Sequence, residues 1–182
     1  MPAAVLFDRD GTLVVDVPYN GDPALVRPMP TALEAVQAVR AAGIPVGVVS
    51  NQSGIARGLV TTDQVAAVNA RVDELFGPFD TWQCCPHGAE DACGCRKPRP
   101  GLVLAAAADL GVPASEVVVI GDIAADLGAA AAAGARGILV PTPVTRPEEV
   151  DAARVSASNL AEAVALALLP ERLSSAPAVP RT

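Results

Sequence analysis

The feature that most constrains this fold is the regular alternation of short apolar runs with longer segments of helical periodicity. The apolar runs cover residues 3–7, 44–49, 116–120 and 136–140, and residues 79–84 add a short fifth run. They lack the polar alternation of a half-exposed strand, which is typical of strands buried on both faces. Helical spacing follows at 31–42, 62–76, 100–110, 124–133 and 159–169. This order predicts an α/β fold, a doubly wound parallel sheet with helices on both faces.

Residues that favour helix ends set the expected boundaries. Thr31 is expected to cap the helix that starts near it, and Thr61 or Thr62 the next one. Pro100 suits the first position of the third helix. Residues 1–169 are expected to form one domain, and the Pro- and Ser-rich residues 170–182 a disordered tail.

Composition and charge narrow the class of protein. The chain has 182 residues, of which 51% are hydrophobic, enough to bury a core. Its net charge of −7, without a basic stripe, argues against a nucleic-acid partner. No apolar run reaches the roughly 18 residues that span a bilayer. The first apolar run has no charged segment before it and ends at Asp8, unlike a signal peptide, so we expect a cytoplasmic protein with no membrane partner.

Three of the predicted strands end in polar residues. Asp8 and Asp10 follow the first strand, Ser50 ends the second, and Asp122 follows the fourth. The carboxyl ends of parallel strands meet at one edge of the sheet, where ligands bind. Two carboxylates around a turn that Gly11 permits could serve as nucleophile and proton donor, although an Asp-rich turn alone is common. The positive charge concentrated at Arg96, Lys97 and Arg99 suits a small anionic ligand better than a polyanion.

The cysteines form a second constellation. All four cysteines and the single histidine fall within residues 84–95, whereas a disulfide framework would spread its cysteines along the chain. Two ligand pairs at i and i+2 can close around one tetrahedral Zn²⁺ and leave no open position, so this zinc would be structural. The ligands would be Cys85, His87, Cys93 and Cys95. Their neighbour Cys84 can also be a buried strand residue.

When the sequence around these residues is considered in full, its motifs resemble those of a known superfamily. FDRDGTL at 7–13 is similar to the first motif of the haloacid dehalogenase (HAD) superfamily of phosphohydrolases, and Ser50, Lys97 before Pro98, and GDIAAD at 121–126 match its later motifs in order. SNQSGIARG at 50–58 and CPHGAEDACGCRKPRPG at 85–101 resemble the D-glycero-D-manno-heptose 1,7-bisphosphate phosphatases and the related histidinol-phosphate phosphatases. That pattern aligns Cys85, not Cys84, with the first zinc ligand.

The resemblance implies a Mg²⁺-dependent phosphatase of a small phosphorylated metabolite. The first candidate substrate is a sugar bisphosphate such as D-glycero-D-manno-heptose 1,7-bisphosphate, and the alternative substrate is histidinol phosphate. Asp8 would attack phosphorus to form an aspartyl-phosphate, and Asp10 would protonate the leaving alcohol and then activate water. Asp8, Asp122 and the backbone carbonyl of Asp10 would bind Mg²⁺. Ser50 and Lys97 would hold the phosphoryl oxygens.

The same resemblance implies which residues surround the substrate. The expected entrance residues are Asp16, Tyr19, Asn51, Gln52, Ser53, Arg57 and Arg96. Residues 16–19 could equally be a plain surface loop. Asp126 could support the acidic group, orient Lys97, or be a solvated helix residue. Ile123 stands where the family pattern has Lys, which removes one possible cationic contact with the substrate. No segment has room for a full cap domain, so the zinc loop should shape the rim.

Two other function classes share part of this pattern. Receiver domains, which accept a phosphoryl group in signalling, also place an Asp and a Lys on a doubly wound sheet, but they lack the DxDGT string and a zinc loop. A zinc-stabilised binding module without catalysis would leave five motif residues in order without a use: Asp8, Asp10, Ser50, Lys97 and Asp122. We therefore expect a monomeric phosphatase.

Overall fold

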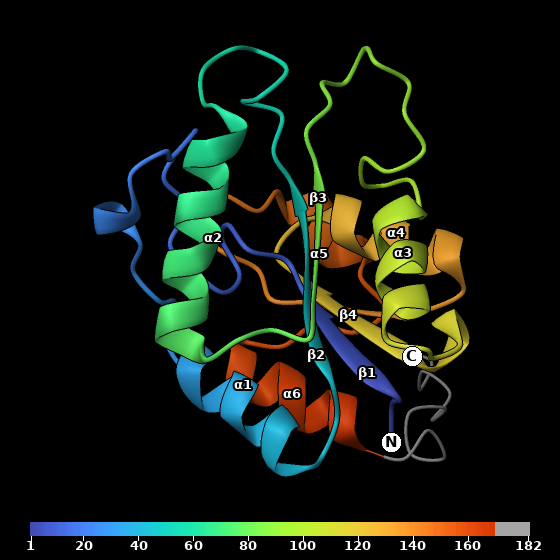
Figure 1. Ribbon diagram of the computed structural model, residues 1–182. Helices are drawn as coiled ribbons and strands as arrows, with labels where there is room; N and C mark the ends of the chain where they lie inside the picture. Colours follow the sequence, from blue (N-terminus) through green and yellow to red (C-terminus); the bar gives the residue numbers. More distant parts are fainter. Residues whose placement is uncertain (170–182) are drawn as a thin grey trace.

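The sheet of this protein is fully parallel and lies between two layers of helices (Figure 1). The computed structural model describes residues 1–169, so the tail expected at 170–182 lies outside the described residues. The strand order is β3-β2-β1-β4-β5. The strands are β1 (Ala4–Phe7), β2 (Val46–Asn51), β3 (Thr81–Cys85), β4 (Val117–Gly121) and β5 (Arg136–Leu139). The predicted doubly wound α/β fold is confirmed.

Each face of the sheet packs against its own helices. Val5 and Phe7 of β1 face one hydrophobic cluster, which α1 (Ala32–Ala41), α2 (Thr62–Phe76) and α6 (Leu160–Leu168) complete. Ala4 and Leu6 face the other, with α3 (Gly101–Asp109) and α4 (Ala124–Ala133). Both faces of β1 are therefore buried, which explains why its apolar run has no polar alternation.

The short helices carry little sequence signal. Sequence periodicity did not predict α5 (Pro147–Ala152), because six residues with no buried side chain show no apolar face. Two 3₁₀ turns cover Pro23–Leu25 and Ala114–Glu116.

The helix starts correct two of the expected boundaries. Thr31 does not cap α1: its φ is 62°, and its hydroxyl accepts a hydrogen bond from the backbone N–H of Ala161 at 3.2 Å instead. Thr61 does cap α2, in a reciprocal capping box with Gln64. Pro100 precedes α3 as its cap residue, so the helix proper begins one residue later.

The carboxyl edge of the sheet is covered by loops. Two of them, at 52–61 and 86–100, extend beyond β2 and β3 in Figure 1, and neither contains a helix or a strand. The 8–31 segment holds one 3₁₀ turn. Within residues 1–169 this edge of the sheet therefore has no cap domain, as predicted. Over the same residues, no helix has the length and apolar character that a membrane span requires.

Candidate active site and metal centres

Three carboxylates and one ammonium group are buried together at the carboxyl edge of the sheet. Asp8 follows β1, Asp122 follows β4, and Asp126 lies in the first turn of α4; one oxygen from each lies within 4.8 Å of the others. Lys97 Nζ donates to Asp8 Oδ1 at 2.6 Å, to Asp126 Oδ1 at 2.6 Å and to the carbonyl of Val49 at 2.8 Å. The fold thus unites residues from three of the predicted motifs.

This cluster has a deficit of positive charge. Burial raises the pKa of Asp8 to about 8, although the charge of Lys97 opposes that shift. Burial and then the charge of Asp126 raise the pKa of Asp122 to about 7. Burial alone would lower the pKa of Lys97, but Asp126 and Asp8 raise it overall, so Lys97 stays charged. Three ionised carboxylates would exceed one ammonium by two charges, and hard oxygen donors with that deficit fit a divalent cation such as Mg²⁺.

Two glycines let the backbone approach these carboxylates. A Cβ on Gly11, which has φ +82°, would lie 2.5 Å from Asp122 Oδ2. A Cβ on Gly121 would overlap the Asp126 side chain. The hydroxyl of Thr12 donates to Asp122 Oδ1 at 3.3 Å. These close approaches explain why glycine stands at these two motif positions.

Asp10 lies beside this cluster and has its own partners. Its carboxylate accepts hydrogen bonds from Arg9 Nε at 3.1 Å, Arg9 Nη2 at 2.9 Å and Gln52 Nε2 at 2.8 Å. The same Gln52 nitrogen lies 2.8 Å from the Ser50 hydroxyl. Gln52, predicted to line the substrate entrance, therefore bridges two predicted catalytic residues. Sequence reasoning missed Arg9, because an Arg between two Asp residues looks like local charge balance.

The loop that carries Lys97 is held by its own contacts. The side-chain amide of Asn51 donates to the backbone carbonyl of Lys97 at 3.1 Å and accepts from its N–H at 3.0 Å. Arg96 Nη1 donates to the carbonyl of His87 at 3.3 Å. Asn51 and Arg96 were both predicted to bind substrate. The structure places them against the catalytic and zinc loops, and their contact with substrate stays a prediction.

Other predicted entrance residues lie on the rim. Arg57 Nη1 donates to the Tyr19 hydroxyl at 2.6 Å, and its guanidinium lies 5.7 Å from the Tyr19 ring centroid. The ring rests on Gly54, where a Cβ would come within 2.8 Å of it. The loops after β1 and β2 are thereby joined. Asp16 is exposed and Ser53 half-buried on these same loops.

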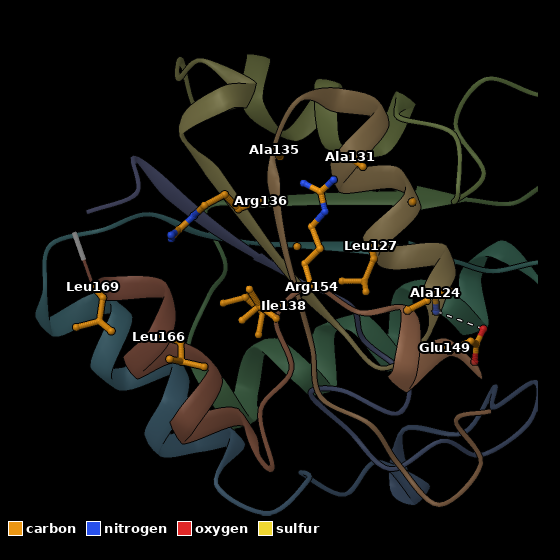
Figure 2. Close-up of a pocket in the computed structure, with 14 residues that line it drawn as sticks. Ala124, Leu127, Ala131, Ala135, Arg136, Ile138, Glu149, Arg154, Leu166 and Leu169 are labelled. Atoms are coloured by element: carbon orange, nitrogen blue, oxygen red, sulfur yellow. Dashed lines mark hydrogen bonds between the residues drawn. The ribbon is translucent and has the colours of Figure 1, made fainter. Parts of the chain in front are cut away.

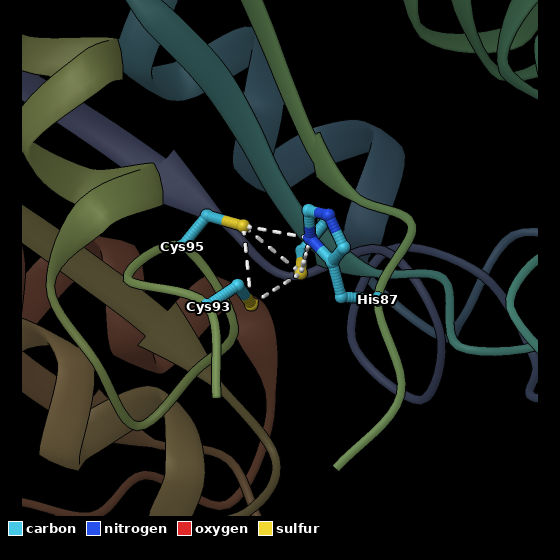
Figure 3. Close-up of side chains that lie close together, drawn as sticks. His87, Cys93 and Cys95 are labelled. Atoms are coloured by element: carbon cyan, nitrogen blue, oxygen red, sulfur yellow. Dashed lines mark hydrogen bonds between the residues drawn. The ribbon is translucent and has the colours of Figure 1, made fainter. Parts of the chain in front are cut away.

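The predicted zinc ligands converge at one point (Figure 3). The Sγ–Sγ distances are 3.2–3.7 Å, and the Nδ1 atom of the imidazole lies 3.3 and 3.5 Å from two sulfurs. A tetrahedral Zn²⁺ with Zn–S bonds of about 2.3 Å would separate its ligand atoms by about 3.5–3.8 Å. The backbone N–H of Arg96 lies 3.4 Å from Cys93 Sγ, a donor that suits a thiolate. The four groups, Cys85, His87, Cys93 and Cys95, therefore fit a closed zinc site.

Cys84 lies outside this group. Adjacent strand residues point to opposite faces, so Cys84 and Cys85 diverge. The side chain of Asn69, on α2, donates to Cys84 Sγ at 3.5 Å, and burial raises the pKa of the Cys84 thiol. Cys84 is therefore a half-buried strand residue outside the zinc cluster.

A cavity of about 790 Å³ lies elsewhere, between α4, β5, α5 and α6 (Figure 2). Its lining is mainly apolar, from Leu127, Ile138 and Leu166, with Arg136 and Arg154 among its polar members. None of the predicted catalytic or metal-binding residues lines it. The chemistry of the buried carboxylates, rather than the volume of this hollow, locates the candidate active site.

Comparison with known proteins agrees with this geometry. Residues 94–167 match the family model described as HAD-hydrolase-like. The chain is 37% identical to the D-glycero-beta-D-manno-heptose-1,7-bisphosphate 7-phosphatase of Pseudomonas aeruginosa, over 76% of this chain and 80% of that protein. It is 41% identical to the Mesorhizobium japonicum enzyme of the same name, over 75% and 69%. The crystal structure of the heptose bisphosphate phosphatase from B. bronchiseptica, complexed with magnesium and phosphate, matches with TM-score 0.79 and 29% identity, over 91% of this chain and 98% of that one.

The fold and the Asp–Lys site define the class of protein as a HAD-superfamily phosphatase, an enzyme that hydrolyses phosphate monoesters. Within that superfamily, the chain belongs to the family that contains these heptose-bisphosphate 7-phosphatases. The resemblance predicted from the motif strings is confirmed.

Proposed function

We propose that this protein is a Mg²⁺-dependent phosphatase that hydrolyses a sugar bisphosphate, foremost D-glycero-D-manno-heptose 1,7-bisphosphate, through an aspartyl-phosphate. The observation that carries the proposal is the buried cluster of Asp8, Asp122 and Asp126 around a single ammonium group, that of Lys97, which donates to Asp8 and Asp126. A phosphate monoester carries two negative charges, which repel an attacking carboxylate unless positive charge is gathered around them.

Several residues of the chain would supply or hold the positive charge around the phosphoryl group. Asp8, Asp122 and the backbone carbonyl of Asp10 would hold Mg²⁺, which supplies positive charge to the phosphoryl group when bound. Lys97 adds a fixed ammonium that contacts Asp8 and is held by Asp126. Asp126 therefore orients Lys97. Ser50 offers a buried hydroxyl to a phosphoryl oxygen.

Proton transfer falls to Asp10. A sugar alkoxide is a poor leaving group, so the bridging oxygen needs a proton as the P–O bond breaks. Asp10 has a side chain that is 25% exposed, so it is open on one side while Arg9 and Gln52 hold it on the other. The same carboxylate can then take a proton from the water that hydrolyses the aspartyl-phosphate.

The substrate assignment rests on the relatives. They are named as 7-phosphatases of heptose 1,7-bisphosphate, and the related B. bronchiseptica structure contains magnesium and phosphate. Ile123, at the start of α4, is 38% exposed near Asp122, so the Lys of the family pattern has no substitute at that position.

We further propose that the Cys/His cluster holds a structural Zn²⁺ that fixes the loop leading to Arg96 and Lys97. The ligand distances support this, as does the closed set of four ligands. We also propose that the protein is cytoplasmic and monomeric, as the sequence predicts. The four cysteines are free, and a reducing compartment would keep them available as metal ligands.

A phosphatase panel tests the proposal. It compares heptose 1,7-bisphosphates, other sugar phosphates and histidinol phosphate with and without Mg²⁺, using Asp8→Asn as the inactive control. We expect the highest kcat/KM for a heptose 1,7-bisphosphate and no turnover after Mg²⁺ is removed. A preference for histidinol phosphate would replace the substrate assignment, and turnover by Asp8→Asn would refute the mechanism.

A further inference from the structure

Arg9 is the largest side chain among those described that are fully buried, at 1% exposure. A guanidinium removed from water needs partners for its charge and its donors. Arg9 has both: Nε and Nη2 point to the carboxylate of Asp10, and Nη1 donates to Asn69 Oδ1 at 2.6 Å. Asn69 lies on α2, so this arginine connects the loop after β1 with a helix on the face of the sheet.

The contact between Arg9 and Asp10 restricts direction as well as distance. Two nitrogens of a planar guanidinium meet the carboxylate, which fixes the plane of the carboxylate better than a single donor does. Gln52 Nε2 adds a third donor, which also contacts the Ser50 hydroxyl. Asp10 is therefore held relative to Ser50, while its exposed side remains open.

We propose that Arg9 is a positioning residue for the reaction: by holding the Asp10 carboxylate, it aims Asp10 at the oxygen of the leaving group. This inference rests on the proposed function, in which the proton on Asp10 passes to the bridging oxygen as the P–O bond breaks and the bond from Asp8 to phosphorus forms. Arg9 neither gains nor loses a proton and does not touch the substrate. Asn69 in turn holds Arg9.

A positioning role has a specific kinetic signature. A leaving group such as p-nitrophenolate departs without a proton, whereas an alkyl alcohol needs one. Loss of Arg9 should therefore lower kcat/KM for alkyl phosphates selectively. A residue that only stabilised the fold would lower activity toward both substrates equally.

The experiment measures kcat/KM for p-nitrophenyl phosphate and for an alkyl phosphate, since kcat/KM reports the first chemical step. The variants are Arg9→Met, Arg9→Lys, Asp10→Asn and the double variant Arg9→Met/Asp10→Asn, in the Mg²⁺-loaded full chain. Arg40→Met is the matched control, because Arg40 binds carbonyls at the end of α2 and has no contact with the site.

We expect Arg9→Met to lower kcat/KM for the alkyl phosphate by about 10- to 100-fold, the cost of a misplaced catalytic group, with a change of less than about threefold for p-nitrophenyl phosphate. The double variant should be no slower than Asp10→Asn alone, because Arg9 acts through Asp10. Arg40→Met should leave the ratio of the two rates unchanged. Arg9→Lys keeps the charge but loses the two-point contact, so it should shift the ratio in the same direction by at least about threefold.

Equal losses on both substrates, or multiplied losses in the double variant, would overturn the inference. If Arg9→Met does not fold, a wild-type rate ratio in Arg9→Lys would overturn it as well. The Asp10→Asn variant separates this inference from the proposed function. If Asp10→Asn slows both substrates equally, proton transfer by Asp10 is itself refuted, whatever Arg9 does.

Discussion

Raising the pH from 6 to 8 should strengthen Mg²⁺ binding to this protein by at least about tenfold. Mg²⁺ binds ionised carboxylates, and it must displace any proton on them. Burial raises the pKa of Asp122 to about 7 and that of Asp8 to about 8 in the metal-free chain. A pH change across this window therefore changes how much of the binding energy is used to release protons.

The two pKa values set the magnitude. With a pKa of about 7, Asp122 is ionised in about a tenth of molecules at pH 6 and about nine tenths at pH 8, which accounts for about tenfold in Mg²⁺ affinity. Asp8, with a pKa of about 8, would contribute up to about fiftyfold more. Lys97 stays charged throughout, because its pKa is raised above the ordinary value.

The stability of the metal-free chain should move in the opposite direction. Both carboxyls have a folded-state pKa above the unfolded value of 3.8, so the unfolded chain loses these protons first as the pH rises. Their contribution is fully present below about pH 4 and is lost as the pH passes through about 7 to 8. For Asp122 alone, the lost contribution to the free energy of unfolding is about 4 kcal/mol, at about 1.4 kcal/mol per pKa unit. At pH 8, bound Mg²⁺ should restore most of the stability that the metal-free chain has lost.

Isothermal titration calorimetry at pH 6, 7 and 8, in buffers of different ionisation enthalpy, measures both the Kd for Mg²⁺ and the protons released. Thermal unfolding with and without Mg²⁺ measures the stability change. Asp122→Asn is the control, because it removes one of the titrating groups. The same Kd at pH 6 and pH 8, without proton release, would refute the reasoning that burial protonates this cluster.

Four further outcomes can be measured directly. Asp8→Asn should lower p-nitrophenyl phosphate turnover by at least about 10³-fold while the metal-free chain becomes more stable to heat, because one buried carboxylate is gone; near-normal turnover would exclude Asp8 as nucleophile. Cys93→Ser should lose zinc and turnover together, with the circular dichroism of the sheet retained and no rescue by Mg²⁺; full activity without zinc would contradict this. Cys84→Ser should retain one zinc per chain and Cys85→Ser should not, as metal analysis would show. Asn51→Ala should lower kcat by up to about 10²-fold with little change in KM, since its amide holds Lys97; a change in KM alone would instead support direct substrate binding.

Much of this fold could be predicted from the sequence, because the determining patterns are local. The apolar runs without polar alternation predicted buried parallel strands, and strands of that kind place Asp8, Ser50 and Asp122 at one edge. The i, i+2 spacing of the metal-binding pairs likewise predicted a four-ligand cluster, which the structure brings together at residues 85–95. The α5 helix was missed, since six exposed or half-buried residues carry no periodic signal.

Only the tertiary structure decided which side chains became partners. Asn51 reaches Lys97 across 46 residues, and Arg9 reaches Asn69 across 60. No spacing rule covers such distances, because the packing of α2 and of the zinc loop against the sheet brings these groups together. Packing also selected Nδ1 of His87 as the atom that faces the sulfurs. The sequence by itself determined which residues gather at the edge of the sheet, since strand ends are local features. Burial determined which of these side chains hydrogen-bond to one another, because a buried polar group must find a partner wherever the fold provides one.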